Sequence, residues 1–329
     1  MTDLYDVAAI GNAIVDVIAP AEDAFLEANG LAKGGMMLVD AVQSQALYDK
    51  MAAGVETSGG SAANTVAGLA SFGGKGAFMG KVADDKLGET FAHDMRAIGA
   101  RFENAPLIGG PATAVSMINV TPDAQRTMCT FLGASVEFTD SDVDKDTVEA
   151  AKIVYLEGYL FDAEAARRAF AKAAGLAHGA GRMIALTLSD GFVVERHRAG
   201  LMGFIETQVD LLFANENEIC ALFETEDFDA AVAALRPHVK LAAITRSEAG
   251  SVILSQGERL KVAAEPVEKV VDTTGAGDQY AAGFMFGLSR GRPLQQCGQL
   301  ASLAAAEVIS HYGPRPQVSL KDLAAAKGY

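Results

Sequence analysis

The sequence contains no tryptophan, only three cysteines and only five histidines in 329 residues, and these scarcities exclude several kinds of protein. Cys129, Cys220 and Cys297 lie far apart, and no two histidines form an H-x-x-x-H pair. Neither a disulfide framework nor a zinc site is therefore indicated. No uncharged apolar run approaches the ~18 residues of a membrane span, and the N-terminus lacks the basic-then-apolar build of a signal peptide. We expect a soluble, cytoplasmic protein.

Positive charge is also scarce, because 27 Lys and Arg face 42 Asp and Glu, for a formal net charge of −15. Nucleic acid and anionic membrane surfaces would repel such a chain, so we expect neither as a partner. An anionic small molecule would need cations, helix dipoles or a metal placed close to it. Half of the residues are apolar, which is enough for a large packed core.

Short β-branched apolar runs alternate with longer Ala-rich segments of helical period, a pattern typical of βαβ units. The expected core strands are Val7–Gly11, Ala77–Val82, Ile153–Glu157, Met183–Ser189, Leu211–Ala214 and Ala242–Thr245. The expected helices include Ala62–Phe72, Leu87–Ile98, Ala163–Ala177, Gly277–Ser289 and Pro293–Ser310. The sequence thus predicts an α/β fold with a doubly wound, mostly parallel sheet flanked by helices.

Two stretches break this alternation, Ile14–Asp40 and the pair Thr113–Val120 with Arg126–Leu132. They contain too few strands for an independent domain. We expect one domain over residues 1–329, with a small β-sheet lid formed by approximately 14–40 and 112–133. An exposed apolar face on this lid would favour a homodimer through it.

The run Asp-Thr-Thr-Gly-Ala-Gly-Asp at 272–278 is the most informative segment. Gly275 and Gly277 allow the backbone to approach a charged ligand, and unpaired N–H groups at the start of the following helix favour negative charge. Asp278 then lies where it could take a proton from a hydroxyl, which suggests phosphoryl transfer. The alternative is a helix that begins with an acidic first turn and has no ligand.

Two polar segments near the N-terminus suit a polyhydroxylated ligand. Gly59-Gly60-Ser61-Ala62-Ala63-Asn64 opens an apolar helix, and Asn64 offers both a donor and an acceptor there. Asn12 and Asp16 follow the first core strand, and a carboxylate can accept from two neighbouring hydroxyls. A flexible capped loop and ordinary turn chemistry are the respective alternatives.

Two further segments follow strands in the second half of the chain. The oxygens of Asn215-Glu216-Asn217-Glu218 could hold hydrated Mg²⁺, or Asn215 and Glu218 could form a capping box, and both can be true. The segment from Thr245 to Gly250 is either a phosphate cradle or a hairpin loop joining Ala242–Thr245 to Ser251–Leu254.

Three more side chains are ambiguous from the sequence. Arg126 either reaches from the lid to a phosphoryl group or is solvated. Tyr159 and Phe161 either stack on a ring or belong to the core.

Taken in order, these motifs resemble the ribokinase-like, PfkB-type carbohydrate and nucleoside kinases over essentially the full length. The series comprises Gly-Asn-x-x-x-Asp, Gly-Gly-Ser-Ala-x-Asn, Gly80-Lys81-Val82-Ala83-Asp84-Asp85 with Gly88, Asn-x-x-Glu and Asp-Thr-Thr-Gly-Ala-Gly-Asp. The resemblance implies an ATP-dependent kinase. In that family role, Asp278 is the base and the backbone of Gly275, Ala276 and Gly277 stabilises the transferred phosphoryl group.

The resemblance also implies the binding residues. Those for the acceptor are Asn12, Asp16, Gly60, Ser61, Asn64 and Tyr159. Those for ATP are Asn215, Thr245, Ser247, Gly250, Ala305 and Val308, with Gly313 nearby and with Ser247 where the family commonly has glycine. Asn215 and Glu218 would support Mg²⁺ through water, and Asp272 with Thr274 would match a potassium site.

Within the family, Gly11–Asp16 and the run Arg126 to Ser135 look most like the adenosine kinase branch. In that reading the acceptor is adenosine or a related nucleoside, and Arg126 helps neutralise the transferring phosphate. One alternative is a kinase for ribose, fructose or 2-keto-3-deoxygluconate. The other is a noncatalytic nucleoside or sugar sensor that kept the pocket.

Overall fold

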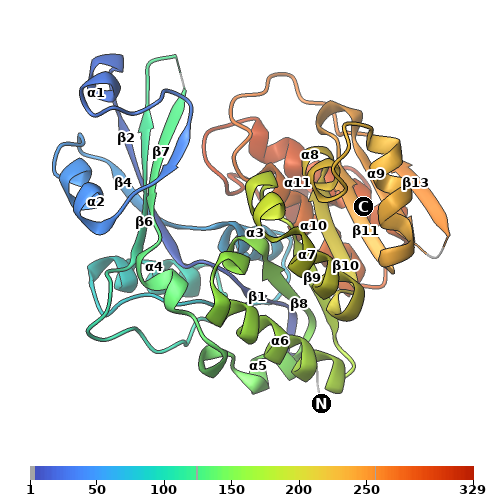
Figure 1. Ribbon diagram of the computed structural model, residues 1–329. Helices are drawn as coiled ribbons and strands as arrows, with labels where there is room; N and C mark the ends of the chain where they lie inside the picture. Colours follow the sequence, from blue (N-terminus) through green and yellow to red (C-terminus); the bar gives the residue numbers. More distant parts are fainter. Residues whose placement is uncertain (1–3, 124, 256) are drawn as a thin grey trace.

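The computed structural model describes residues 4–123, 125–255 and 257–329. Its main sheet has eight strands in the order β13-β12-β11-β10-β9-β8-β1-β5 (Figure 1). In that order the strands are Glu258–Val262, Ser251–Ser255, Leu241–Thr245, Leu211–Asn215, Met183–Thr187, Ala151–Glu157, Tyr5–Ile10 and Gly76–Met79. The strands from β11 to β5 are parallel, whereas β12 and β13 add an antiparallel edge.

The central strands are apolar on both faces because helices cover both. In β1, Ala8 and Ile10 belong to one buried cluster, and Val7 and Ala9 belong to the other, as the two-residue period of a strand requires. One face is covered by α5 (Lys145–Ala150), α6 (Glu164–Gly179), α7 (Gly191–Gln208), α8 (Glu216–Leu222) and α9 (Phe228–Leu235). The other is covered by α3 (Ser61–Ser71), α4 (Lys86–Ala97), α10 (Ala276–Ser289) and α11 (Leu294–Ile309).

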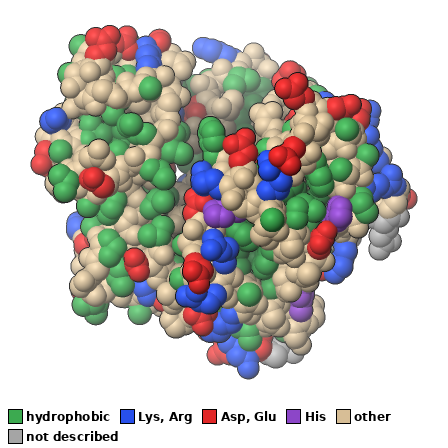
Figure 2. Space-filling model, in the orientation of Figure 1, with side chains coloured by type: hydrophobic (Ala, Val, Ile, Leu, Met, Phe, Trp, Pro, Cys, Tyr) green, Lys and Arg blue, Asp and Glu red, His purple; other side chains and the backbone are tan. Residues whose placement is uncertain are grey.

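A separate five-stranded sheet, the lid, has the order β3-β7-β6-β2-β4. These strands are Met36–Leu38, Arg126–Phe131, Ala114–Val120, Ile14–Pro20 and Val55–Gly59. The short helices α1 (Asp23–Ala28) and α2 (Ala41–Tyr48) accompany it, and α12 (Leu320–Ala326) lies near the C-terminus. Figure 2 shows the lid as a lobe beside the main body, with the surface hollowed between them.

The predicted fold class is confirmed: a largely parallel sheet is flanked by helices, and a small sheet forms a lid. Most boundaries agree within a few residues, although the strand expected over Ala77–Val82 ends at Met79. β4 also belongs to the lid, because it pairs with β2. It lies outside the ranges predicted for the lid, since this pairing is a long-range contact that the sequence does not reveal. The assignment of residues 1–329 to one domain stays a prediction.

In the described ranges, no helix combines the length and the apolar character that crossing a bilayer requires. The cytoplasmic location stays a prediction from the sequence.

Candidate active site

Asp278 lies where the first turns of two helices meet. It is the third residue of α10, and its carboxylate accepts hydrogen bonds from Ser61 Oγ (2.6 Å) and from Asn64 Nδ2 (3.4 Å) in the first turn of α3. Gly275 precedes α10 with a φ of +79°, and a Cβ there would lie 2.6 Å from the backbone of Pro314. The structure thus brings together residues of two motifs that lie more than 200 positions apart in the sequence.

Burial raises the pKa of the Asp278 carboxyl to about 6, against the opposing effect of the hydrogen bonds from Ser61 and Asn64 and of the Arg315 charge. At neutral pH this carboxyl is mainly ionised but remains close to its pKa. A carboxylate in that state can accept a proton from a hydroxyl, which is the property of a general base.

A second buried carboxylate, Glu157 at the end of β8, was not among the predicted site residues. Its Oε1 accepts from Asn12 Nδ2 (2.8 Å) and Asn12 N (3.3 Å), and its Oε2 accepts from Ala62 N (2.9 Å). Because β1 and β8 are parallel neighbours, their carboxyl ends bring Asn12 and Glu157 together. Burial raises the pKa of Glu157 to about 7. The sequence signal that could have identified Glu157 was a carboxylate at the end of a buried strand.

Asp16 lies on β2 of the lid, with only 8 % of its surface exposed. Burial raises the pKa of its carboxyl to about 7, while the charges of Arg315 and Arg126 oppose the rise. A Cβ on Gly59 would overlap this carboxylate, so glycine is required beside it. Gly60 also needs glycine, because its φ is +90° and a Cβ would overlap the carbonyl of Asn12.

Arg126 is not solvated, which removes one of the two alternatives left by the sequence, and its contact with a phosphoryl group stays a prediction. Its side chain is 8 % exposed, and Nη2 lies 2.8 Å from Asp272 Oδ2. Its guanidinium also lies 5.8 Å from the ring centre of Tyr312. Within the described residues, Nε and Nη1 are buried without an acceptor. Arg126, Tyr312 and residues of β2 and β6 line a cavity of about 430 Å³ between the lid and the main body.

The carboxylate of Asp272 is fully engaged by protein donors. Oδ1 accepts from Thr274 N (3.0 Å) and Thr274 Oγ1 (2.7 Å), and Oδ2 accepts from Gly313 N (3.0 Å) as well as facing Arg126. A potassium ion needs free oxygen ligands, so the Asp272 carboxylate does not fit it in this conformation. The potassium site stays a prediction, and we derive no step through it.

Asn215 and Glu218 form the predicted capping box at the start of α8. Asn215 N (3.0 Å) and Asn215 Nδ2 (2.7 Å) donate to Glu218, and Glu218 N donates to Asn215 Oδ1 (2.8 Å). Burial raises the pKa of Glu218 to about 7, and the charge of Asp190 adds to the rise. Each Glu218 oxygen keeps acceptor capacity after these bonds, which fits a hydrated Mg²⁺ bound through water.

The segment from Thr245 to Gly250 forms a hairpin loop between β11 and β12, which is one of the two alternatives expected from the sequence. Ser247 has a φ of +49°, a conformation that favours glycine and explains why a glycine suits this position. Arg246 lies over the Phe228 ring (3.7 Å) and is paired with Glu216 (3.0 Å), so its charge is already compensated. The ATP roles of Thr245, Ser247 and Gly250 stay predictions.

The remaining predicted residues are partly or completely buried. Tyr159 is partly buried against the cluster that contains Phe161, and burial raises the pKa of its hydroxyl. Ala305 is partly buried on α11, whereas the side chain of Val308 is completely buried. In this conformation Val308 can shape a nucleotide site only by packing.

Two polar residues near Asp278 were missed as site residues. Gln279, fully buried, donates to Asn64 O (3.0 Å) and Pro314 O (2.9 Å). Arg315 donates from Nε to Asn64 Oδ1 (3.0 Å) and from Nη1 to Ser58 Oγ (2.8 Å). Arg315 stands between two prolines in an irregular segment, and neither spacing nor periodicity connects it with α3 or α10.

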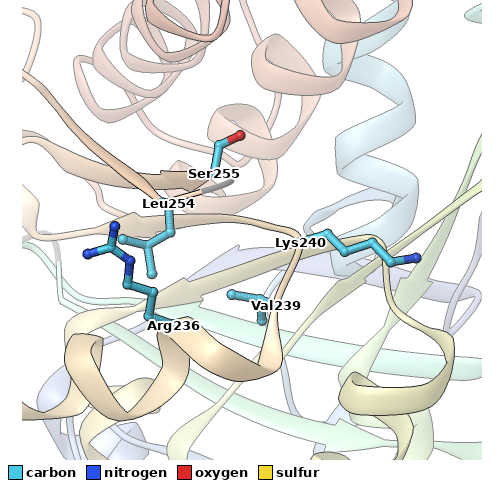
Figure 3. A pocket seen from close by; sticks show the side chains of 6 residues that line it. Arg236, Val239, Lys240, Leu254 and Ser255 are labelled. Atoms are coloured by element: carbon cyan, nitrogen blue, oxygen red, sulfur yellow. The ribbon is translucent and has the colours of Figure 1, made fainter.

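A second cavity, of about 340 Å³, lies beside β11 and β12, away from these residues (Figure 3). Arg236, Val239 and Lys240 contribute to its wall, and Lys240 is paired with Asp210 (2.7 Å). No predicted site residue lines it, so we do not assign the reaction to it. Within the described residues, no group of three or more His, Cys, Asp or Glu has the arrangement of a metal site.

The chain is similar to known kinases along its length. The pfkB family carbohydrate kinase profile matches residues 6–320. The crystal structure of adenosine kinase from Sinorhizobium meliloti is 53% identical and covers 98% of this chain and 99% of that one, with a TM-score of 0.91. A probable sugar kinase protein from Rhizobium etli CFN 42 is 46% identical over 100% of this chain and 99% of that one, with a TM-score of 0.93.

A more distant relative is the adenosine kinase of Saccharomyces cerevisiae, which is 28% identical over 331 residues, 93% of this chain and 95% of that protein. The profile match spans nearly the whole chain and includes the residues that surround Asp278. The chain therefore belongs to the pfkB family of carbohydrate kinases, on its adenosine kinase branch, and is an enzyme that transfers phosphate to an alcohol group.

Proposed function

We propose that this enzyme uses ATP to phosphorylate the primary, 5′-type hydroxyl of a nucleoside, most simply adenosine. The observation that carries the proposal is the Asp278 carboxylate, which is buried between the starts of α3 and α10 with a pKa of about 6. The similarity to the Sinorhizobium meliloti adenosine kinase supports a nucleoside as acceptor.

In this proposal the acceptor hydroxyl attacks the γ-phosphorus of ATP while its proton passes to the Asp278 carboxylate. The new bond joins the acceptor oxygen to phosphorus. The bond from phosphorus to the bridging oxygen breaks, and its electron pair leaves with ADP. Positioning of the reactants contributes about 7–11 kcal/mol in favourable systems, and electrostatic stabilisation of the phosphoryl group supplies much of the rest.

The start of α10 supplies the proposed anion hole. The N–H of Ala276 donates to Thr273 O (3.2 Å), so the hole relies mainly on the N–H groups of Gly275 and Gly277. Arg126 keeps two buried donor atoms without an acceptor in the described residues, which suits a cation that turns toward a phosphoryl group. Mg²⁺, bound through water near Asn215 and Glu218, would neutralise charge on the ATP phosphates.

The acceptor would lie against Asn12, Asp16 and Asn64. Asn12 Oδ1 is buried without a donor among the described residues, so it can accept from a hydroxyl of the acceptor. Asp16 is the buried carboxylate of the lid that can accept from two neighbouring hydroxyls. Gly60 and Ser61 would line the same side.

A sugar kinase is the second candidate, favoured by the similarity to the Rhizobium etli protein. The test is ADP release from purified enzyme with Mg-ATP and adenosine, inosine, ribose, fructose or 2-keto-3-deoxygluconate. Turnover that is strongest with adenosine supports the nucleoside assignment. Turnover with a free sugar alone overturns the acceptor assignment, and the absence of ADP release across a broad panel would contradict the kinase mechanism.

We also propose a homodimer through the lid. Its edge strand β3 exposes Met36, Met37 and Leu38 by 52%, 40% and 59%, and a second copy could cover them. Light scattering after gel filtration should give the mass of a dimer for the wild type and of a monomer for Met36→Lys with Leu38→Lys. A monomeric wild type at micromolar concentration would exclude the dimer.

A further inference from the structure

Arg315 lies in the irregular segment between α11 and α12, behind the residues that surround the reacting groups. We propose that Arg315 is a positioning residue of the phosphoryl-transfer site, which orients the amide of Asn64 and keeps the carboxylate of Asp278 able to accept a proton. The inference rests on the proposed function and adds a residue to it.

The orientation of Asn64 follows from its two partners. Arg315 Nε donates to Asn64 Oδ1 (3.0 Å), and Asn64 Nδ2 donates to Asp278 Oδ2 (3.4 Å). A flipped amide would point its NH₂ group at the guanidinium, which has only donors, and its oxygen at the carboxylate, which has only acceptors. Arg315 therefore selects the one amide orientation that stabilises an ionised Asp278.

Arg315 also acts through its charge. In the described part of the chain it forms no salt bridge: its hydrogen bonds go to Asn64 and Ser58, and its buried Nη2 has no acceptor. Its charge instead lowers the pKa of the Asp278 and Asp16 carboxyls, against the larger effect of burial, and it also interacts with Asp94.

The other titratable groups near Asp278 do not lower its pKa, because they are either acidic or uncharged. Asp16 and Glu157 are carboxyls whose titration is coupled to that of Asp278 by repulsion. Tyr155 and Tyr159 have pKa values raised by burial and stay uncharged near neutral pH. Arg126 acts on Asp16 and is itself paired with Asp272, so Arg315 is the cation that acts on the proposed base.

The second hydrogen bond of Arg315 connects this arrangement to the lid. Nη1 donates to Ser58 Oγ (2.8 Å) on β4, and Ser58 N donates to Asp94 Oδ2 (2.9 Å) on α4. Arg315 thus joins the lid strand that pairs with the Asp16 strand to the helix that bears Asn64. The position of the lid and the state of the base are linked through one side chain.

The test is the pH profile of kcat/KM for the wild type, Arg315→Met and Arg315→Lys, with Mg-ATP and an acceptor on which the wild type is active. Loss of the cation should raise the pKa of Asp278, so the acidic limb of Arg315→Met should move upward by about one pH unit. Arg315→Lys keeps the positive charge but loses the planar guanidinium that bonds to Asn64 and Ser58. The acidic limb of its pH profile should therefore stay close to that of the wild type, while its kcat falls. The matched control is Arg168→Met, which removes a cation from the exposed surface of α6.

An acidic limb that does not move in Arg315→Met would overturn the proposal, and so would an equal displacement in Arg315→Lys, which would indicate a packing effect. Circular dichroism verifies folding, and Arg315→Gln is the replacement if the Met variant does not fold. A second measurement does not depend on turnover: carboxyl ¹³C NMR of aspartate-labelled protein, with Asp278→Asn to identify the signal. An equal Asp278 pKa in the wild type and Arg315→Gln would refute the role of Arg315. A wild type without kinase activity would instead refute the proposed function.

Discussion

The starts of α8 and α10 look alike in the sequence, since each carries an acid in its first helical turn, yet the structure uses the two acids differently. Glu218 exchanges hydrogen bonds with Asn215, three residues before it, and so caps its own helix. Asp278 bonds to Ser61 and Asn64 of another helix, 217 and 214 positions earlier. Burial raises the pKa of both carboxyls, to about 7 and about 6. An acid that bonds to its own helix start thus acts as a helix cap. An acid that bonds to a distant helix is not needed as a cap and is available for another role.

The largest expected effect follows from removing the acid of α10. Asp278→Asn should keep the fold and ATP binding but lower kcat by about 10²–10⁴-fold, the usual contribution of a general base. The measurement is ADP release, with Glu164→Gln as control because Glu164 is also an acid in a first helical turn, that of α6, but is exposed. Turnover of Asp278→Asn at the wild-type rate would show that Asp278 is not the catalytic base.

The pH dependence of the wild-type rate tests the role of the same acid. With a pKa of about 6, the carboxyl of Asp278 loses its ability to accept a proton as the pH falls. The value of kcat/KM should therefore decline below about pH 6 and approach a tenfold loss per pH unit well below it. A rate profile that is flat from pH 7 to pH 5, with the enzyme still folded by circular dichroism, would contradict the assignment.

Glu157 provides an intermediate case, because its partners are distant but its role is to hold backbone. Its folded pKa of about 7 lies above the ordinary value of 4.5, so the folded state loses stability as pH rises between these values. The stability of Glu157→Gln relative to the wild type should therefore increase from pH 5 to pH 7. Urea unfolding at both pH values measures this, with the exposed Glu103→Gln as control. A relative stability that falls with pH would show that the carboxyl is not protonated more readily in the folded state.

The smallest effect concerns α8. Asn215→Ala removes the cap and should lower the free energy of unfolding by about 0.5–2 kcal/mol. If Asn215 also supports hydrated Mg²⁺, the Mg²⁺ concentration for half-maximal rate should rise as well. Urea unfolding and a Mg²⁺ titration of ADP release separate the two roles. An unchanged Mg²⁺ requirement would leave Asn215 with a capping role alone.

The sequence predicted the features that depend on neighbours along the chain. Alternating strands and helices gave the fold class, and the run around Asp278 gave the helix start and the acid within it. Asn215 and Glu218 satisfied a local spacing rule, which is why their capping box was predicted. The antiparallel turn at Gly250 was predicted as one of two alternatives for the same reason.

The features that were missed depend on contacts between distant segments. Glu157 reaches Asn12 and Ala62 only because β1 and β8 are adjacent in the sheet. Arg315 reaches Asn64 from 251 positions away. The burial of Arg126 likewise requires the lid to lie against the segment that bears Tyr312. A single sequence carries no periodicity or spacing that reveals such contacts.

The bridge made by Gln279 has a consequence for protein engineering. A Cβ on Gly68 would overlap the Gln279 side chain, and would lie 2.9 Å from the Cβ of Ala282. Positions 68 and 279 therefore share one volume, and an exchange at either is constrained by the other. A combinatorial library should recover Gly68→Ala only with a smaller residue at 279, so these two positions should be randomised as a pair.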